Sequence, residues 1–328
     1  MEKNMTSNKA APVNCGREEI NVRGKMTGFS AIEINNVKIV IKGKYLRIAE
    51  VREEWDEDIV DPQLTIEALR KSGTRVDIFT FIQRLPESRP KYDYHMEWDS
   101  IAAVPITSYE HWRKNQISKQ ARNRIRKAEK SGVVIRKIAL GDELFKSISD
   151  IYNENPIRQR KRNFHYNMEF EMVKKLNSTF SDRADFIGAY FNDEVIGYIK
   201  LVYSDRYART MGIMGKVKHR DKYPMNLLVA KAVEVCAEKR VPYLTYAKYD
   251  YGKVGSDSLK EFKKNNGFEN ILIPRYYTPL SKYGSIVMML RLHRGIKNIL
   301  PLWLARTLRR ILMVWYSIRY YRYFKSGD

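Results

Sequence analysis

The sequence predicts an α/β protein whose mixed sheet is covered by packed helices. Runs of β-branched and aromatic residues, which favour strands, alternate with segments that carry helix-capping residues. The second half of the chain follows a regular order: three strands, a helix, a strand, a helix and a strand. With 328 residues, of which 44% are hydrophobic, the chain can form one large domain or two modest ones.

The first half of the chain contains both kinds of element. Residues 1–28 are polar and mixed in charge, so we expect a flexible arm there. The sequence then predicts strands over 37–41 and 45–51, a helix over 62–71, strands over 76–83 and 96–104, a long helix over 108–130 and a strand over 133–138. Asp61 and Pro62 mark the start of the first helix, and Thr107 or Ser108 caps the second. Both helices end at a Ser-Gly pair.

The second half is more regular. It predicts helices over 142–155 and 168–176, strands over 185–191, 195–202 and 206–214, a helix over 225–239, a strand over 242–246, a helix from Ser258 and a strand over 271–273. The helix from Ser258 stops at Asn-Asn-Gly-Phe, where Gly267 supplies a left-handed cap and Phe268 its apolar contact.

A helix that ends in this way beside a strand holds the side chains of its last turns in fixed positions. Such a position suits a reacting lysine, and Lys263 occupies it after Phe262. Plain packing, or a solvent-exposed lysine beside Lys264, would give the same pattern. The neighbouring segments must therefore decide between these interpretations.

Charge and cysteine content limit the classes of function. The formal net charge of +22 favours polyanionic partners, such as nucleic acid, anionic membranes or phosphorylated cofactors. Cys15 and Cys236 lie far apart, which argues against a disulfide framework and for a reducing compartment. The five histidines show no pairing at metal-ligand spacing, so we expect no metal. The polar start lacks the apolar core of an export signal, so we expect a cytoplasmic protein.

The element order and three segments resemble a known family. The strand meander followed by helix, strand, helix and strand is the layout of the GNAT acyltransferase fold. The segments SKQARNRIRKAEKSGVV (118–134), DFIGAYFNDEVIGYIKL (185–201) and the Phe-Lys-x-x-x-Gly-Phe of 258–268 are similar to the Fem-type branch, the peptidoglycan-bridge aminoacyltransferases and their relatives in polysaccharide gene clusters. The resemblance covers residues 108–280. It implies a degenerate GNAT-like half over 29–138, a GNAT-like acyltransferase domain over 139–290 and a basic tail over 291–328.

The resemblance gives Lys263 a role. Transfer of an acyl group to an amine passes through a tetrahedral oxyanion. A positioned ammonium can stabilise this oxyanion, or it can protonate the leaving oxygen. Asp250 is a candidate general base in the loop before this helix. The tyrosines of the same loop would line the substrate channel: Tyr246, Tyr249 and Tyr251.

The donor implied by the resemblance is an acyl-CoA or an aminoacyl-tRNA. Enzymes that use acetyl-CoA place a Gly-rich turn before the central helix, but this chain has GKVKHRDKYPMN over 215–226. Basic side chains and a capping asparagine would bind the donor's phosphates instead, namely Lys216, Lys218, His219, Arg220 and Asn226. Arg158 and Arg160 lie in a second basic segment with interleaved aromatic residues, which suits phosphates and stacked bases.

The segment 301–325 predicts a basic amphipathic helix. One stripe is apolar and rich in Leu, Ile and Trp, while arginines lie mainly elsewhere. This pattern is typical of a helix that lies in an anionic membrane surface, and the alternative is a helix docked on the domain or a partner. We therefore expect a protein on the inner face of the cell membrane.

These observations predict an acyltransferase that acts on an amine, or a hydroxyl, of a cell-envelope glycan or lipid-linked precursor. Two alternatives stay open. The charge alone would also suit a non-enzymatic nucleic-acid-binding protein, although the chain lacks a zinc-finger spacing or an RNA-binding motif. An ordinary acetyl-CoA-dependent N-acetyltransferase is the other.

Overall fold

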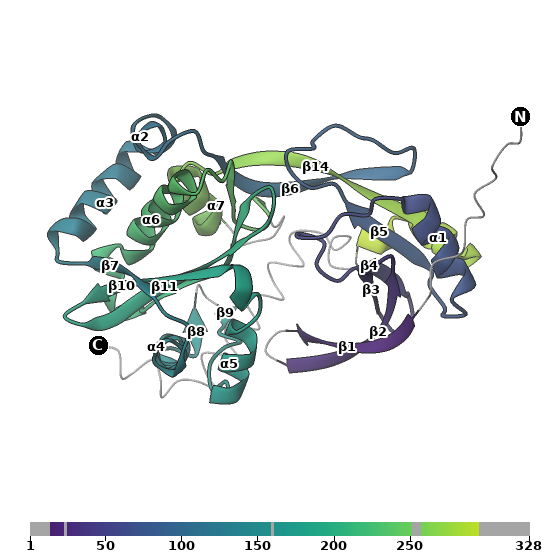
Figure 1. Cartoon of the computed structure of the whole chain (residues 1–328), viewed down its shortest axis with the longest axis horizontal. Coiled ribbons are helices and arrows are strands. Elements are labelled where there is room, and N and C mark those ends of the chain that lie inside the picture. Colours follow the sequence, from purple (N-terminus) through teal and green to yellow (C-terminus); the bar gives the residue numbers. More distant parts are fainter. Residues whose placement is uncertain (1–13, 23–24, 159–160, 251–256, 295–328) are drawn as a thin grey trace, which may run out of the picture. The chain divides into compact units, whose positions relative to one another are not determined.

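The computed structural model describes residues 14–22, 25–158, 161–250 and 257–294 (Figure 1). These residues form two compact units. Unit 1 contains 14–99 and 273–294, and unit 2 contains 100–272. The chain passes from unit 1 to unit 2 between residues 99 and 100, within a strand, and β14 (Glu269–Pro279) returns it to unit 1.

Unit 1 is built on strands that pair mostly antiparallel. They are β1 (Asn14–Val22), β2 (Lys25–Ile34), β3 (Val37–Lys42), β4 (Ile48–Val51), β5 (Ile78–Ile82) and the end of β14, in that spatial order. Strands β4 and β5 are parallel, and α1 (Pro62–Lys71) connects them. Asp61 caps this helix by accepting a hydrogen bond from the Leu64 N–H, as predicted.

Residues 14–22 and 25–28 differ from the expected flexible arm. They form β1 and the start of β2, which pair in continuous antiparallel register from Asn14 opposite Glu33 to Val22 opposite Lys25. The polar composition misled the prediction because β1 needs no apolar face to make backbone hydrogen bonds with β2.

The end of unit 1 is a short helical segment. Ser281 caps α8 (Lys282–Met289), and a 3₁₀ turn, Leu292–Arg294, follows it. The helix approaches β5 closely at Gly284, where a Cβ atom would lie 1.9 Å from the carbonyl oxygen of Asp77. Only a glycine fits at this approach.

Unit 2 has a sheet with helices on both faces. Its strands are ordered as the end of β6 (His95–Pro105), β13 (Tyr243–Thr245), β12 (Ala208–Gly215), β11 (Glu194–Tyr203), β10 (Ala184–Phe191) and β7 (Val134–Ile138). Only β12 and β13 pair in parallel among these described strands. The strand order agrees with the predicted meander and the return through helix and strand.

Two apolar layers hold the helices of unit 2 to its sheet. On one face, α3 (Lys119–Lys130) and α6 (Pro224–Glu238) cover Ile187 and Ile199. On the other, α4 (Asp142–Asn153) and α5 (Phe170–Asn177) cover Phe186 and Tyr198 (Figure 1). Successive strand residues thus point to opposite layers, as a strand that is buried on both faces requires.

The helix predicted over 108–130 is divided in two. Ser108 caps a short helix, α2 (Tyr109–His111), which continues as a π-helical turn, Trp112–Gln116. Ile117 is extended, with φ −90° and ψ 152°, and Ser118 then caps α3. The prediction of one helix was wrong because tertiary hydrogen bonds of this region, described below, outweigh its local helical preference.

Among the residues described, none of the helices combines the length and the apolar composition that crossing a membrane requires.

Candidate functional site

The C-terminal end of α7 (Asp257–Asn265) has the structure that the sequence predicted. Gly267 is left-handed, with φ 82°. The Phe268 N–H donates to the Lys263 carbonyl oxygen at 3.0 Å, and the Phe268 side chain is 3% exposed. These are the backbone and apolar contacts of a left-handed helix cap.

Three further groups bind the carbonyl oxygens that a helix end leaves unpaired. The Trp112 indole N–H donates to the Asn266 carbonyl at 3.0 Å, and the Ser118 N–H donates to the Asn265 carbonyl at 3.0 Å. The Gly267 N–H donates to the Lys264 carbonyl at 3.2 Å. The break between the π-helical turn and α3 places the Ser118 N–H at this helix end, which explains why the predicted long helix is interrupted.

Asn226 joins the start of α6 to the same helix end. Its amide donates to the side-chain oxygen of Asn266 at 3.0 Å, and the Asn266 amide donates to the Phe262 carbonyl at 2.7 Å. Both asparagines are buried. The expectation that Asn226 caps α6 is wrong: the helix begins at Pro224, and the preceding residue, Tyr223, is left-handed with φ 52°.

Lys263 is fully buried, at 0% exposure, so it is not the solvent-exposed lysine that the pattern also allowed. Its ammonium donates to the Lys248 carbonyl oxygen at 2.6 Å and lies 4.5 Å from the centre of the Tyr246 ring. Burial lowers the pKa of Lys263 to about 8. A lysine with this pKa can both hold and release a proton near neutral pH, which an exposed lysine does poorly.

The loop before α7 is held along β6. The Tyr246 N–H donates to the Ala102 carbonyl at 2.8 Å, and the Tyr249 N–H donates to the Ser100 carbonyl at 3.3 Å. The structure therefore brings Tyr246 and Lys263 together. Tyr251, the third predicted channel residue, lies outside the described residues.

Asp250 is bound elsewhere on α7. Its carboxylate lies 2.6 Å from the Lys260 ammonium, which also lies 6.0 Å from the centre of the Tyr249 ring. Lys260 precedes Lys263 by three residues, so the ion pair lies on the turn of α7 next to Lys263. Asp250 is thus paired with Lys260, a cation one helical turn before the candidate lysine.

The predicted donor-binding lysines surround one carboxylate. The ammonium groups of Lys216 and Lys218 lie 2.6 and 2.8 Å from Glu194, and the His219 Nε2 lies 3.1 Å from it. Burial raises the pKa of Glu194, but the hydrogen bonds from Lys216, Lys218 and His219 outweigh this effect and lower the pKa to about 2. Arg220, the remaining residue of this loop that was predicted to bind the donor's phosphates, is exposed.

The backbone donors of this loop bind a second carboxylate. The N–H groups of Val217 and Lys218 both donate to Glu154. Arg158 also contacts Glu154, at 3.1 Å, and donates to the carbonyl oxygens of Gly215 and Ile151 at 2.8 and 2.7 Å. The place where a Gly-rich turn would bind pyrophosphate therefore holds the chain's own carboxylate.

Arg160, the other arginine predicted for donor binding, lies outside the described residues.

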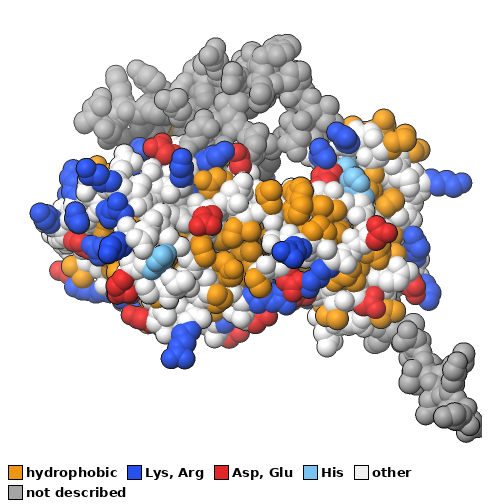
Figure 2. Space-filling model, turned by 90° about the horizontal axis from the view of Figure 1, so that it is seen from above, with side chains coloured by type: hydrophobic (Ala, Val, Ile, Leu, Met, Phe, Trp, Pro, Cys, Tyr) orange, Lys and Arg blue, Asp and Glu red, His pale blue; other side chains and the backbone are white. Residues whose placement is uncertain are grey.

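The basic side of α3 is accessible. A shallow surface pocket is lined mainly by basic residues of this region: Tyr109, Glu110, Arg113, Lys114, Arg122 and Arg126. Figure 2 shows Lys and Arg side chains gathered on the face of unit 2 that carries α3.

Sequence reasoning missed several of these groups. Trp112 and Asn266 bind across elements that are distant in the sequence, so no local pattern reveals them. Lys200 is a second buried lysine, whose ammonium donates to the carbonyls of Asn177 and Thr179 at 2.8 and 2.6 Å. Its position in the apolar run VIGYIKLVY was a usable signal, because a charge inside a buried strand needs partners.

Comparisons with known proteins support the fold. No family model and no curated protein matches the chain. FemX matches in structure with a TM-score of 0.52 and 10% sequence identity, over 80% of this chain and 88% of that chain. The C-terminal domain of a putative lysylphosphatidylglycerol synthetase from Agrobacterium fabrum matches with a TM-score of 0.51 and 13% identity, over 77% and 83% of the two chains. L-PGS from Bacillus licheniformis matches with a TM-score of 0.51 and 14% identity, over 80% and 86%. These likenesses confirm the predicted Fem-like GNAT fold.

The binding of the α7 end by Trp112 gives a test of stability. Trp112→Phe keeps an aromatic ring in the core but leaves the buried Asn266 carbonyl without its donor, so we expect a loss of about 1–3 kcal/mol in the free energy of unfolding. Urea unfolding measures it. Trp98→Phe is the matched control, because Trp98 is 52% exposed and its replacement should change stability by less than about 0.5 kcal/mol. Equal stability of Trp112→Phe and the wild type would contradict this account.

Proposed function

We propose that the chain is an acyltransferase that moves an acyl or aminoacyl group onto an amine, or a hydroxyl, of a cell-envelope glycan or lipid-linked precursor. The observation that carries the proposal is the buried Lys263 with its lowered pKa, at the capped end of α7 in a Fem-like GNAT fold. A buried lysine costs stability that an apolar side chain would not, and such groups gather at functional sites.

Lys263 would act on the charge that develops during transfer. Attack of the acceptor's amine on the donor's acyl carbonyl forms a carbon–nitrogen bond and a tetrahedral oxyanion, and collapse of the oxyanion expels the donor's oxygen or sulfur. A positioned ammonium stabilises the oxyanion or gives its proton to the leaving atom, and the proton that the attacking amine loses then returns to the lysine. The 2.6 Å hydrogen bond to the Lys248 carbonyl orients the Lys263 ammonium, and the Tyr246 ring beside it favours the charged form.

The names of the similar structures support an envelope acceptor. One of them is a putative lysylphosphatidylglycerol synthetase, a name that describes a lysyl group and a phospholipid. The chain's own Fem-type segments point the same way.

We include in the proposal a peripheral location on the inner membrane face through residues 301–325, which lie outside the described residues. Flotation with anionic liposomes tests this, and equal flotation after removal of 301–328 would contradict it.

The donor is better matched by an aminoacyl-tRNA than by acetyl-CoA. Glu154 occupies the backbone N–H groups before α6, and Glu194 binds the side chains of Lys216, Lys218 and His219. A small pyrophosphate must displace both carboxylates to bind there. The basic surface of α3, with Arg122 and Arg126 in its shallow pocket, offers an extended polyanion a site without this displacement.

Calorimetric titration with acetyl-CoA and with charged tRNA separates the candidate donors. We expect saturable binding of charged tRNA, weakened at least several-fold by Arg122→Ala with Arg126→Ala. Glu194→Gln frees three basic groups and should strengthen binding of acetyl-CoA without creating activity. Glu234→Gln, which unpairs Lys231 on α6, is the control.

Tight binding of acetyl-CoA by the wild type would favour an N-acetyltransferase. Salt-sensitive binding of random RNA without preference for charged tRNA would favour a nucleic-acid-binding protein.

The role of Lys263 is tested by transfer kinetics. Lys263→Ala removes the ammonium that stabilises the oxyanion, so we expect kcat/KM to fall about 10²–10³-fold. Because the protonated form acts, wild-type kcat/KM should also fall as the pH rises through about 8. Lys264→Ala, at the exposed neighbouring position, is the matched control and should retain full activity. Full turnover by a folded Lys263→Ala variant, checked by circular dichroism, would remove Lys263 from the mechanism.

A further inference from the structure

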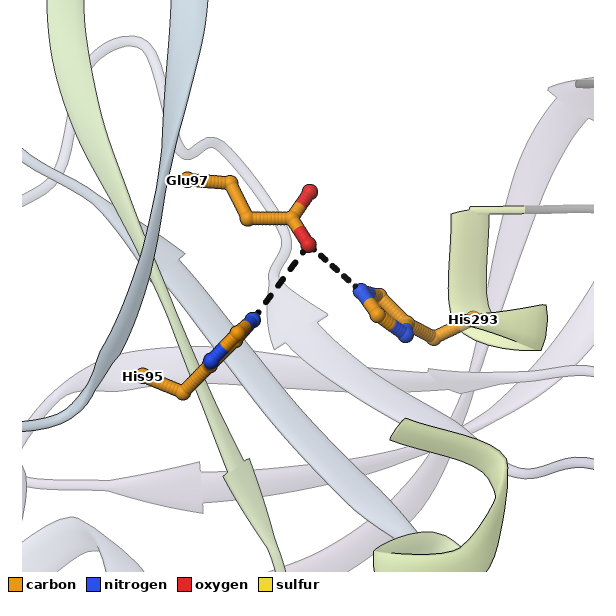
Figure 3. Close-up of side chains that lie close together, drawn as sticks. All are labelled: His95, Glu97 and His293. Carbon is orange, nitrogen blue, oxygen red and sulfur yellow. Dashed lines mark hydrogen bonds and ion pairs between the residues drawn. The ribbon is translucent and has the colours of Figure 1, made fainter. Parts of the chain in front are cut away.

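A cluster of metal-ligand side chains lies in unit 1 (Figure 3). His95 and Glu97 are on β6, two residues apart, so both side chains leave the same face of the strand. His293 belongs to the 3₁₀ turn after α8. The spacing of the histidines predicted no metal, since His293 lies far from His95 and Glu97 in the sequence and reaches them only through the fold.

The three side chains point at one another. The His293 Nε2 lies 2.8 Å from the Glu97 Oε1, and the His95 Nε2 lies 3.4 Å from the same oxygen. The three ligand atoms all lie within 4.8 Å of one another. A tetrahedral Zn²⁺ with bonds of about 2.0–2.2 Å separates its ligand atoms by roughly 3.3 Å, so small side-chain shifts would place these atoms around one ion.

The cluster is buried on the side of His293 and exposed on the side of His95. The His293 side chain is 0% exposed, and its ring packs 4.8 Å from that of Tyr277. His95 is 51% exposed, so an ion can enter from its side and keep water as a further ligand.

Two features limit the affinity. Arg294 lies against the same carboxylate, with its Nε and Nη2 at 3.0 and 2.9 Å from Glu97 Oε1, and its charge would repel a divalent ion. The His293 Nδ1 is buried without a hydrogen-bond partner among the described residues. A ligand histidine usually donates from its other nitrogen, and loss of that partner typically weakens a metal site 10- to 100-fold.

We propose that His95, Glu97 and His293 form a binding site for a divalent transition-metal ion, with Zn²⁺ as the ion that two imidazoles and one carboxylate suit. The ion would take the place that the Arg294 guanidinium now holds at Glu97. It would join β6 to the 3₁₀ turn across 196 positions of sequence, and so fasten the end of the α8 segment to the sheet of unit 1.

Metal uptake by the full chain tests the site. After chelator treatment and dialysis against Zn²⁺, elemental analysis should find one ion per chain, and Co²⁺ should give the visible absorption of a four-coordinate site. His95→Gln and Glu97→Gln should lower the affinity at least about tenfold. His95→Gln alters an exposed residue, so it keeps the test valid if the other variant unfolds. His111→Gln, at an exposed histidine outside the cluster, is the control and should bind like the wild type.

Arg294→Ala should change the Zn²⁺ affinity in the opposite direction. Because it removes the competing cation, it should raise the Zn²⁺ affinity. Zn²⁺ at 100 times its dissociation constant should multiply the folded-to-unfolded ratio about 100-fold, seen as a higher Tm in the wild type and not in His95→Gln. Equal Zn²⁺ affinity of the wild type, His95→Gln and Glu97→Gln would overturn the proposal, as would the absence of stoichiometric uptake by both the wild type and Arg294→Ala.

Discussion

The end of α7 is the feature on which the candidate site depends. A helix end leaves carbonyl oxygens unpaired, and burying them without donors costs about 1–3 kcal/mol each. Here the donors come from the Trp112 indole and from the backbone of Ser118 and Phe268. The region before α3 departs from a regular α-helix, and this departure places these donors at the end of α7. The local irregularity and the fixed position of Lys263 therefore have the same physical cause.

Internal pairing decides which of the many positive charges are available to a ligand. The chain carries a net charge of +22, but Glu194 binds three basic side chains before α6, and Glu154 binds Arg158 and two backbone donors. Arg122 and Arg126 of α3 line an open pocket instead, beside the ion pair of Arg113 with Glu129. Net charge thus indicates polyanionic partners in general, whereas the distribution of carboxylates indicates where on unit 2 such a partner can bind.

Much of the fold could be predicted from local sequence. The Asp61 cap, the strand meander from β10 to β12 and the left-handed Gly267 all depend on neighbouring residues, and all are present. The interruption at Ile117, the pairing of Asn226 with Asn266 and the meeting of His95 with His293 depend on contacts between distant segments. No residue pattern within a few positions contains that information, so local rules could not have given these features. The strand β1 was missed for a related reason, because its partner rather than its composition makes it a strand.

The capped end of α7 holds Lys263 in a site where its charge is costly. Direct titration of the lysine side chains by NMR, in protein labelled with ¹³C at the lysine Cε, tests it most directly, with Lys263→Met to assign the Lys263 signal. We expect a pKa of about 8 for Lys263, and a rise toward the ordinary lysine value of about 10.4 when Trp112→Phe loosens the helix end. An ordinary lysine pKa for Lys263 in the wild-type protein would contradict it.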